Sequence, residues 1–268
     1  RRRCAFTFRT VSTTSKSLAL PGMPYFFSAG VTALYFFAIW AGAALFLRDK
    51  SMVGAFTQGA FRGSQAILGV AFVQNLYGDA GLVPLMIVAS VPLYNIFSVL
   101  VLTVTAPDAR TADHHGVVRR TLRGIITNPI ILGILLGVPF SLLRVKLPTI
   151  LSSTLNTIGG TATPVALLAV GASFSSGEAA KCVKPALLAT AIKLFILPAV
   201  FLPIAAMMGF TGSAMIAILI MVGSPTTVSC YVMAKNMGYK GVLTSSVVML
   251  ATVLSSVSLT LWIFLLRL

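Results

Sequence analysis

Long apolar runs alternate along the chain with short polar connectors. About 20 mainly apolar residues suffice to cross a hydrocarbon core about 30 Å thick, so each long run predicts a membrane-spanning helix. The runs at 187–208 and 243–268 meet this criterion with a single charged residue each. The pattern predicts an all-α integral membrane protein with about nine transmembrane helices, at 18–30, 31–47, 53–77, 82–104, 125–143, 148–174, 186–207, 213–235 and 242–266.

The composition is far from that of a soluble protein. Hydrophobic residues make up 57% of the chain, charged residues 9%, and the mean hydropathy is +0.96. The net charge of +15 does not indicate nucleic acid as a partner, because Lys and Arg lie in short connectors rather than in a stripe with interleaved aromatics. The three cysteines, Cys4, Cys182 and Cys230, lack the spacing of a metal site or a disulfide framework, and no cofactor is predicted.

The connectors carry their charge asymmetrically. If the spans alternate in direction, the connectors on one side contain ten Lys and Arg residues and those on the other side contain three. The positive-inside rule makes the first side cytoplasmic, which places the connector 105–124 inside the cell and the carboxyl terminus outside. The ten residues are Arg48, Lys50, Arg110, Arg119, Arg120, Arg123, Lys181, Lys184, Lys235 and Lys240, and the three are Arg144, Lys146 and Arg267.

The two halves of the chain resemble each other at a constant offset. The segment GSQAILGVAFVQNLYG at 63–78 aligns with GSPTTVSCYVMAKNMG at 223–238, an offset of 160 residues. With 105–124 as a hinge loop, the first repeat is 18–104 and the second is 125–268, and each would have five spans if one more preceded residue 18. An odd number of spans inverts the second copy relative to the first, as in many secondary transporters.

Residues 1–17 are predicted to be an irregular leader. They lack an initiator Met, an apolar core and a cleavage pattern, so they do not read as a secretory signal. Two interpretations stay open. Their Arg- and Ser/Thr-rich, acid-free composition suits an organelle transit peptide, and the alternative is the remnant of a first span lost by truncation.

Breaks in the apolar spans mark the candidate substrate site. In transporters with inverted repeats, sites lie near the midplane, where helices are broken and backbone groups face a cavity. The segment MVGSPTTVSC at 221–230 combines glycine, proline and several hydroxyls, and GSQ at 63–65 matches it. A proline-kinked packing helix is the alternative. The candidate substrate-binding residues at the breaks are Gly63, Ser64, Gln65, Gly223, Ser224, Pro225, Thr226 and Thr227.

Four further residues within spans join the candidate site. Arg62 and Lys193 are cations inside predicted spans, where a buried charge usually faces a cavity or a partner, and snorkelling to the cytoplasmic surface is the alternative. Asn95 would contact substrate or hydrogen-bond a neighbouring helix, and Pro164 would break its helix or pack among small residues. No Asp or Glu lies clearly inside a predicted span, which favours an anionic substrate over a cation.

The spans also lack the groups that catalysis needs. They contain no HExxH motif, no paired carboxylates and no histidine. A serine nucleophile would therefore have no base inside the membrane, and we expect that the protein is not an enzyme.

Taken together, six segments resemble the auxin efflux carrier family, particularly its bacterial members, in the family order over about residues 18–268. The resemblance implies ten helices in two inverted five-helix repeats, a transport part that moves against a scaffold, and a homodimer. It also implies that 53–77 and 213–235 are the crossing broken helices, and that the substrate is auxin or a dicarboxylate such as malate or malonate. The segments are GAFTQGAFRGSQAILGVAF (54–72), LYGDAG (76–81), PLYNIFSVLVL (92–102), TNPIILGILLGVPFSLL (127–143), TPVALLAVGASF (163–174) and GSPTTVSCYVMAKNMG (223–238).

The chain departs from the family pattern in two places. Ser64 stands where family members often have Asn, which puts in doubt an amide contact at that position, and the first family helix is absent from this sequence. The resulting prediction is a carrier of a small organic anion in the bacterial inner membrane, working by alternating access. The alternative is a membrane receptor or regulatory protein that binds a small ligand without moving it.

Overall fold

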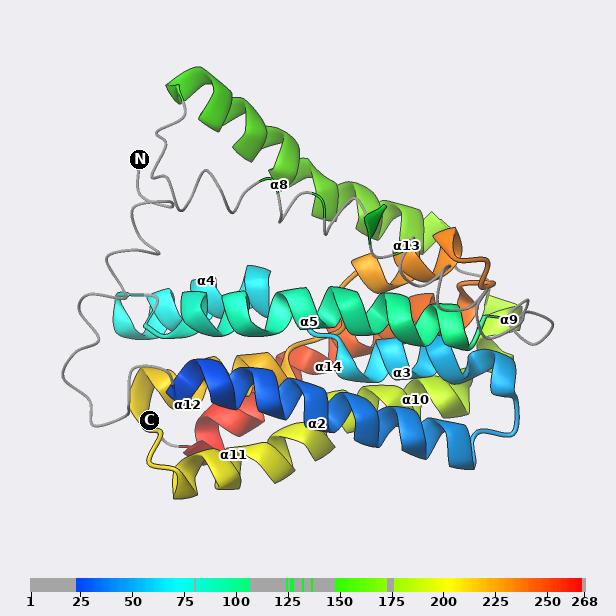
Figure 1. Ribbon diagram of the computed structural model, residues 1–268, viewed down its shortest axis with the longest axis horizontal. Helices are drawn as coiled ribbons and strands as arrows, with labels where there is room; N and C mark the ends of the chain where they lie inside the picture. Colours follow the sequence, from blue (N-terminus) through cyan, green and yellow to red (C-terminus); the bar gives the residue numbers. More distant parts are fainter. Residues whose placement is uncertain are drawn as a thin grey trace.

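The computed structural model describes residues 23–79, 81–106, 148–172 and 176–266, with isolated positions between 107 and 147, and the described residues form helices without a β-strand (Figure 1). In chain order these are α2 (Met23–Phe46), η1 (Lys50–Met52), α3 (Val53–Phe61), α4 (Gln65–Tyr77), α5 (Val83–Val104), α8 (Thr149–Ala172), α9 (Ser176–Lys181), α10 (Val183–Ala191), the π-helical η3 (Ile192–Ile196), α11 (Leu197–Met207), α12 (Gly212–Gly223), α13 (Ser229–Asn236) and α14 (Val242–Leu266).

Four helical runs among the described residues are long and apolar enough to cross a membrane. They are α2, α5, the continuous run from α10 through η3 to α11, and α14, with lengths of 22 to 25 residues. At a rise of about 1.5 Å per residue each extends beyond 30 Å, the thickness of a hydrocarbon core. The chain is therefore an integral membrane protein. The predicted leader 1–17, most of the hinge 105–124 and the predicted span 125–143 lie outside the described residues.

The first two predicted spans are one helix where the structure describes them. The sequence divided this region at residues 30 and 31, whereas α2 runs without interruption from Met23 to Phe46. Gly30 lowers helix propensity by about 1 kcal/mol relative to Ala, which is too little to end a helix flanked by apolar residues on both sides. Pro24 lies in the first turn, where its missing amide costs no hydrogen bond.

Two of the predicted spans contain a true break rather than a kink. The helix α3 ends at Phe61 and α4 begins at Gln65, with Arg62 in an extended conformation between them. The helix α12 ends at Gly223 and α13 begins at Ser229. The prediction of broken helices at both Gly-Ser pairs is confirmed, and the alternative of a continuous kinked helix at 221–230 is wrong.

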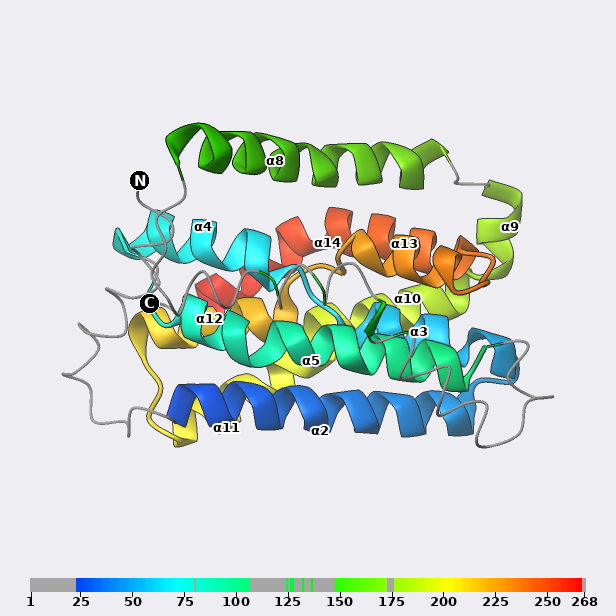
Figure 2. The ribbon, with the colours of Figure 1, turned by 45° about the horizontal axis from the view of Figure 1, so that its top comes forward.

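The two broken helices lie side by side and in opposite directions. The helix before one break packs against the helix after the other, because α4 contacts α12 and α3 contacts α13 (Figures 1 and 2). Hydrogen bonds join them at the breaks. The amide of Ser64 donates to the carbonyl of Pro225 at 2.9 Å, and the hydroxyl of Thr226 donates to the carbonyl of Gly59 at 2.7 Å.

The offset between the halves extends over three consecutive elements. The long helix, the broken helix and the next long helix begin at residues 23, 53 and 83 in the first half and at 183, 212 and 242 in the second, which gives differences of 160, 159 and 159. In both views α2 and α5 run from left to right, whereas α11 and α14 run from right to left (Figures 1 and 2).

The described helices pack into one large body with α8 at its side. A single hydrophobic core contains buried residues of α2, α3, α4, α5, α10, α11, α12, α13 and α14. The helix α8 adds only Val170 to a separate small cluster with Val228, Tyr231 and Val248. Its 24 residues include the polar stretch SSTLNT, and it is not among the four apolar spans. Little apolar contact therefore joins α8 to the body.

The basic connectors of the described residues meet at one end of the body. The loop after α2, the α9 region and the loop between α13 and α14 all lie at the right-hand end of Figures 1 and 2. Burial raises the pKa of the Cys182 thiol, and charged residues of all three connectors add smaller effects. These residues are Glu178, Asp49, Lys181 and Lys240, so the three connectors lie close to one another. The connectors at the opposite end, 78–82 and 208–211, contain no Lys or Arg.

This charge distribution yields a prediction of sidedness. In a background with the three native cysteines replaced by Ser, we expect Lys240→Cys to react with a membrane-impermeant thiol reagent only from the cytoplasmic side. Thr211→Cys, at the opposite end, should react only from outside. Both positions are exposed, so access to the reagent depends on the membrane alone. The cysteine-free protein is the control, and labelling in the reverse order would contradict the predicted topology.

Candidate functional site

The breaks present one accessible face and one buried face. Ser64, Ala66, Thr227 and Ser229 are partly or fully accessible. The other candidate residues at the breaks are buried, namely Arg62, Gly63, Gln65, Gly223, Ser224, Pro225 and Thr226. The hydroxyls on the accessible face are therefore available to a ligand, while the buried residues hold the breaks in place from behind.

Lys193 lies between the two broken helices. Its side chain is fully buried, and its Nζ donates to the carbonyl of Phe61 at 3.2 Å and to that of Met221 at 3.3 Å. Phe61 ends α3 and Met221 lies in the last turn of α12, so the ammonium binds the negative ends of two helix dipoles. The Tyr35 ring is 5.7 Å from Nζ, within the range of a cation–π contact.

The local helix geometry places Lys193 there. The π-helical stretch η3 contains Lys193, and the amide of Leu197 closes it by donating to the carbonyl of Ile192, five residues back. The next residue, Pro198, has no amide to donate to the carbonyl of Leu194. That carbonyl instead accepts the indole N–H of Trp262 at 2.9 Å. Widened turns of this kind often occur at functional sites.

Arg62 directly follows the last residue of α3, and its side chain is buried at the first break. Its Nη2 donates to Oδ1 of Asn95 at 2.8 Å, and its Nη1 lies 3.3 Å from both the Ser98 hydroxyl and the Met233 sulfur. Asn95 in turn donates to the carbonyl of Val91 at 3.0 Å. None of these three partners is a carboxylate, so they leave the positive charge of the guanidinium uncompensated.

Several polar groups at the breaks have no partner among the described residues. The Oε1 of Gln65 and the hydroxyl of Ser224 are both buried and unpaired, although Nε2 of Gln65 donates to the Ser90 hydroxyl. The first amides of a helix lack an acceptor within that helix. At the starts of α4 and α13, the amides of Gln65, Ala66 and Ser229 donate to no described acceptor. Helix N-termini with free amides are anion-binding sites.

Close packing at both breaks requires glycine. A Cβ added to Gly63 would lie 2.5 Å from the Ser224 hydroxyl and 3.0 Å from Nζ of Lys193, and a Cβ on Gly223 would lie 2.8 Å from Cγ of Pro198. The two Gly-Ser pairs are therefore needed for the close approach of the helices, in addition to any role in the break itself.

The structure brings together eleven of the twelve predicted residues. Pro164 is the exception, because it lies on the exposed surface of α8, whose described link to the breaks is the cluster of Val170 with Val228. The alternative in which Arg62 and Lys193 snorkel to the cytoplasmic surface is wrong, since both side chains are buried and bonded inside the body.

Sequence reasoning missed a pair of tyrosines beside the breaks. The hydroxyl of Tyr35 donates to that of Tyr94 at 2.8 Å, and Tyr94 donates to the carbonyl of Met221 at 3.3 Å. Both rings are almost fully buried. Their hydroxyls in apolar spans were the available signal, but no spacing rule connects residues on α2 and α5.

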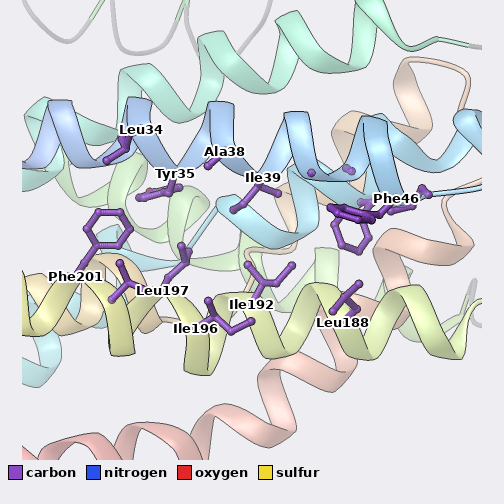
Figure 3. A pocket seen from close by; sticks show the side chains of 15 residues that line it. Leu34, Tyr35, Ala38, Ile39, Phe46, Leu188, Ile192, Ile196, Leu197 and Phe201 are labelled. Atoms are coloured by element: carbon purple, nitrogen blue, oxygen red, sulfur yellow. The ribbon is translucent and has the colours of Figure 1, made fainter.

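An apolar groove of about 540 Å³ runs between α2 and α10–α11. Figure 3 shows Leu34, Ile39 and Phe46 of α2 facing Leu188, Ile196 and Phe201 across it. Its lining offers an anion no charged partner, so it is not the candidate site. The described residues also contain no group of three His, Cys, Asp or Glu side chains that could hold a metal.

Comparison with known protein families assigns the class. The model of a family described as membrane transport protein matches residues 5–263. Because the match covers nearly the whole chain, the protein belongs to this family of membrane transporters, which is the auxin efflux carrier family that the sequence resembles. No curated protein matches the chain. The family is one of transporters, which agrees with the expectation that the protein is not an enzyme.

The glycine contacts yield a prediction about stability. Gly63→Ala should lower the free energy of unfolding by about 1–3 kcal/mol, because its Cβ would force Ser224 and Lys193 apart. The control is Gly30→Ala on exposed α2 surface with nothing within 4 Å, which should be neutral or stabilising by about 0.5–1 kcal/mol. Thermal unfolding in detergent measures both, and equal melting temperatures would contradict the close approach.

Proposed function

We propose that the protein is a carrier of a small carboxylate or dicarboxylate that binds at the accessible face of the two helix breaks. Membership of the membrane transport family supports transport over the receptor alternative. The substrate class rests on one observation. The N-termini of α4 and α13 meet at the breaks, where their first amides have no acceptor among the described residues, beside the hydroxyls of Ser64, Thr227 and Ser229.

The charges around the breaks support an anion. Two buried cations, Arg62 and Lys193, flank the breaks, and neither hydrogen-bonds a carboxylate among the described residues. A carboxylate gains from helix N-termini through the partial positive charge there. The same partial positive charge would repel a cationic substrate. The groove of Figure 3, by contrast, offers only apolar contact.

The arrangement of the helices supports alternating access. The matching triples of elements, with their opposite directions, fit an inverted repeat in which α2–α5 pairs with α10–α14. The single core of these helices suits a rigid unit, and the small contact with α8 suits a surface along which that unit moves. The proposed location is a bacterial inner membrane with the basic end of the body in the cytoplasm.

Uptake into proteoliposomes tests the function. We expect saturable flux of radiolabelled malate, malonate or indole-acetate, measured with and without an imposed potential and proton gradient. Empty liposomes and excess unlabelled acid are the controls. Binding of an acid without flux of any acid would instead support the receptor alternative.

Substitutions at the breaks test the site. Arg62→Ala combined with Ser224→Ala should lower substrate affinity about 10-fold, because the variant loses the positive charge of Arg62 behind the accessible face, and a tenfold change in affinity corresponds to about 1.4 kcal/mol. Arg48→Ala, in the connector after α2, changes the same net charge away from the breaks and should leave affinity unchanged. Unchanged uptake and affinity in the double variant, with folding verified by its melting temperature, would defeat the site assignment.

A further inference from the structure

The ammonium of Lys193 joins the carbonyl ends of two helices that approach each other at the breaks. The C-terminus of a helix carries a partial negative charge of about half an electron. The ends of α3 and α12 would therefore repel if nothing lay between them. Lys193 donates to the carbonyls of Phe61 and Met221, one at each end. It belongs to η3, which is part of neither broken helix.

The surroundings of Nζ resemble the coordination shell of a small cation. Two backbone carbonyls and the face of the Tyr35 ring surround the nitrogen. The unpaired hydroxyl of Ser224 lines the same space, because both it and Nζ would lie within 3.0 Å of a Cβ placed on Gly63. Uncharged oxygen ligands of this kind suit alkali and alkaline-earth cations.

In secondary transporters with broken helices, the exposed carbonyls and C-terminal ends of the half-helices bind the coupling cation. We propose that the Lys193 ammonium is a tethered substitute for such a cation, so that this carrier holds its broken helices together without Na⁺. The cation is part of the chain and cannot dissociate. No Na⁺ then has to bind, cross or leave during transport.

This inference rests on the proposed function where it concerns coupling, but the cation site itself can be tested without any substrate. The protein is purified in detergent, and its melting temperature is measured as NaCl replaces choline chloride at constant ionic strength. A ligand that binds only the folded state raises the melting temperature as its concentration increases.

Three variants separate a cation site from ordinary packing. Lys193→Ala removes the charge and leaves room for an ion, so it should melt lower than the wild type in choline chloride and recover saturably, by about 2–4 °C or more, in NaCl. Lys193→Met fills the space with no donor and should melt lower without recovery. Lys184→Met, at an exposed position on α10, is the matched control and should match the wild type in both salts.

Each outcome decides the question. A saturable increase of the melting temperature with Na⁺ that is confined to Lys193→Ala supports the tethered cation. Purification of folded Lys193→Ala in NaCl, but not in choline chloride, also supports it. The same Na⁺ effect in Lys193→Met, or none in folded Lys193→Ala, overturns it.

The wild type gives a second measurement if Lys193→Ala does not fold in either salt. The proposal requires a wild-type melting temperature and a wild-type flux that do not depend on Na⁺, and dependence of either on Na⁺ overturns it. Absence of flux with every acid would defeat the proposed function, while the melting-temperature comparison would still stand.

Discussion

The carbonyl ends of α3 and α12 can approach each other because a cation lies between them. Lys193 supplies that cation from a third helix, and the position of its Nζ depends on the widened turn that Pro198 permits. The other features at the centre follow from this contact. Gly63 and Gly223 lack side chains because the helices pass so closely, and the hydrogen bond between Ser64 and Pro225 fixes one break against the other.

This arrangement separates the two kinds of helix end. The carbonyl ends are neutralised inside the body by Lys193, whereas the first amides of α4 and α13, near the accessible face, have no acceptor in the part of the chain that the structure describes. Arg62 adds a further positive charge behind that face, held by Asn95 rather than by an acid. The field around the breaks is therefore positive where a ligand can reach, although no charged side chain at the breaks is exposed.

The sequence predicted the breaks because their cause is local. Glycine, proline and small hydroxyl residues weaken a helix wherever they cluster, and the offset of 160 residues identified both copies. The role of Lys193 could not be predicted, since it depends on contacts with residues 132 and 28 positions away. Gly30 suggested a boundary that α2 does not have, and Pro164 suggested a site that packing leaves on the surface. Single small residues are ambiguous because their effect depends on neighbours in space.

The antiparallel meeting of the two broken helices has a consequence for the symmetry of the breaks. Each break contributes one amide end and one carbonyl end, and the two contributions point opposite ways through the membrane. The two breaks share their Gly-Ser pair but not their flanking side chains, because Val222 and Pro225 stand where the first break has Arg62 and Gln65. The backbone ends therefore follow a twofold pattern that the side chains do not, and the two ends of the body are chemically distinct at the breaks.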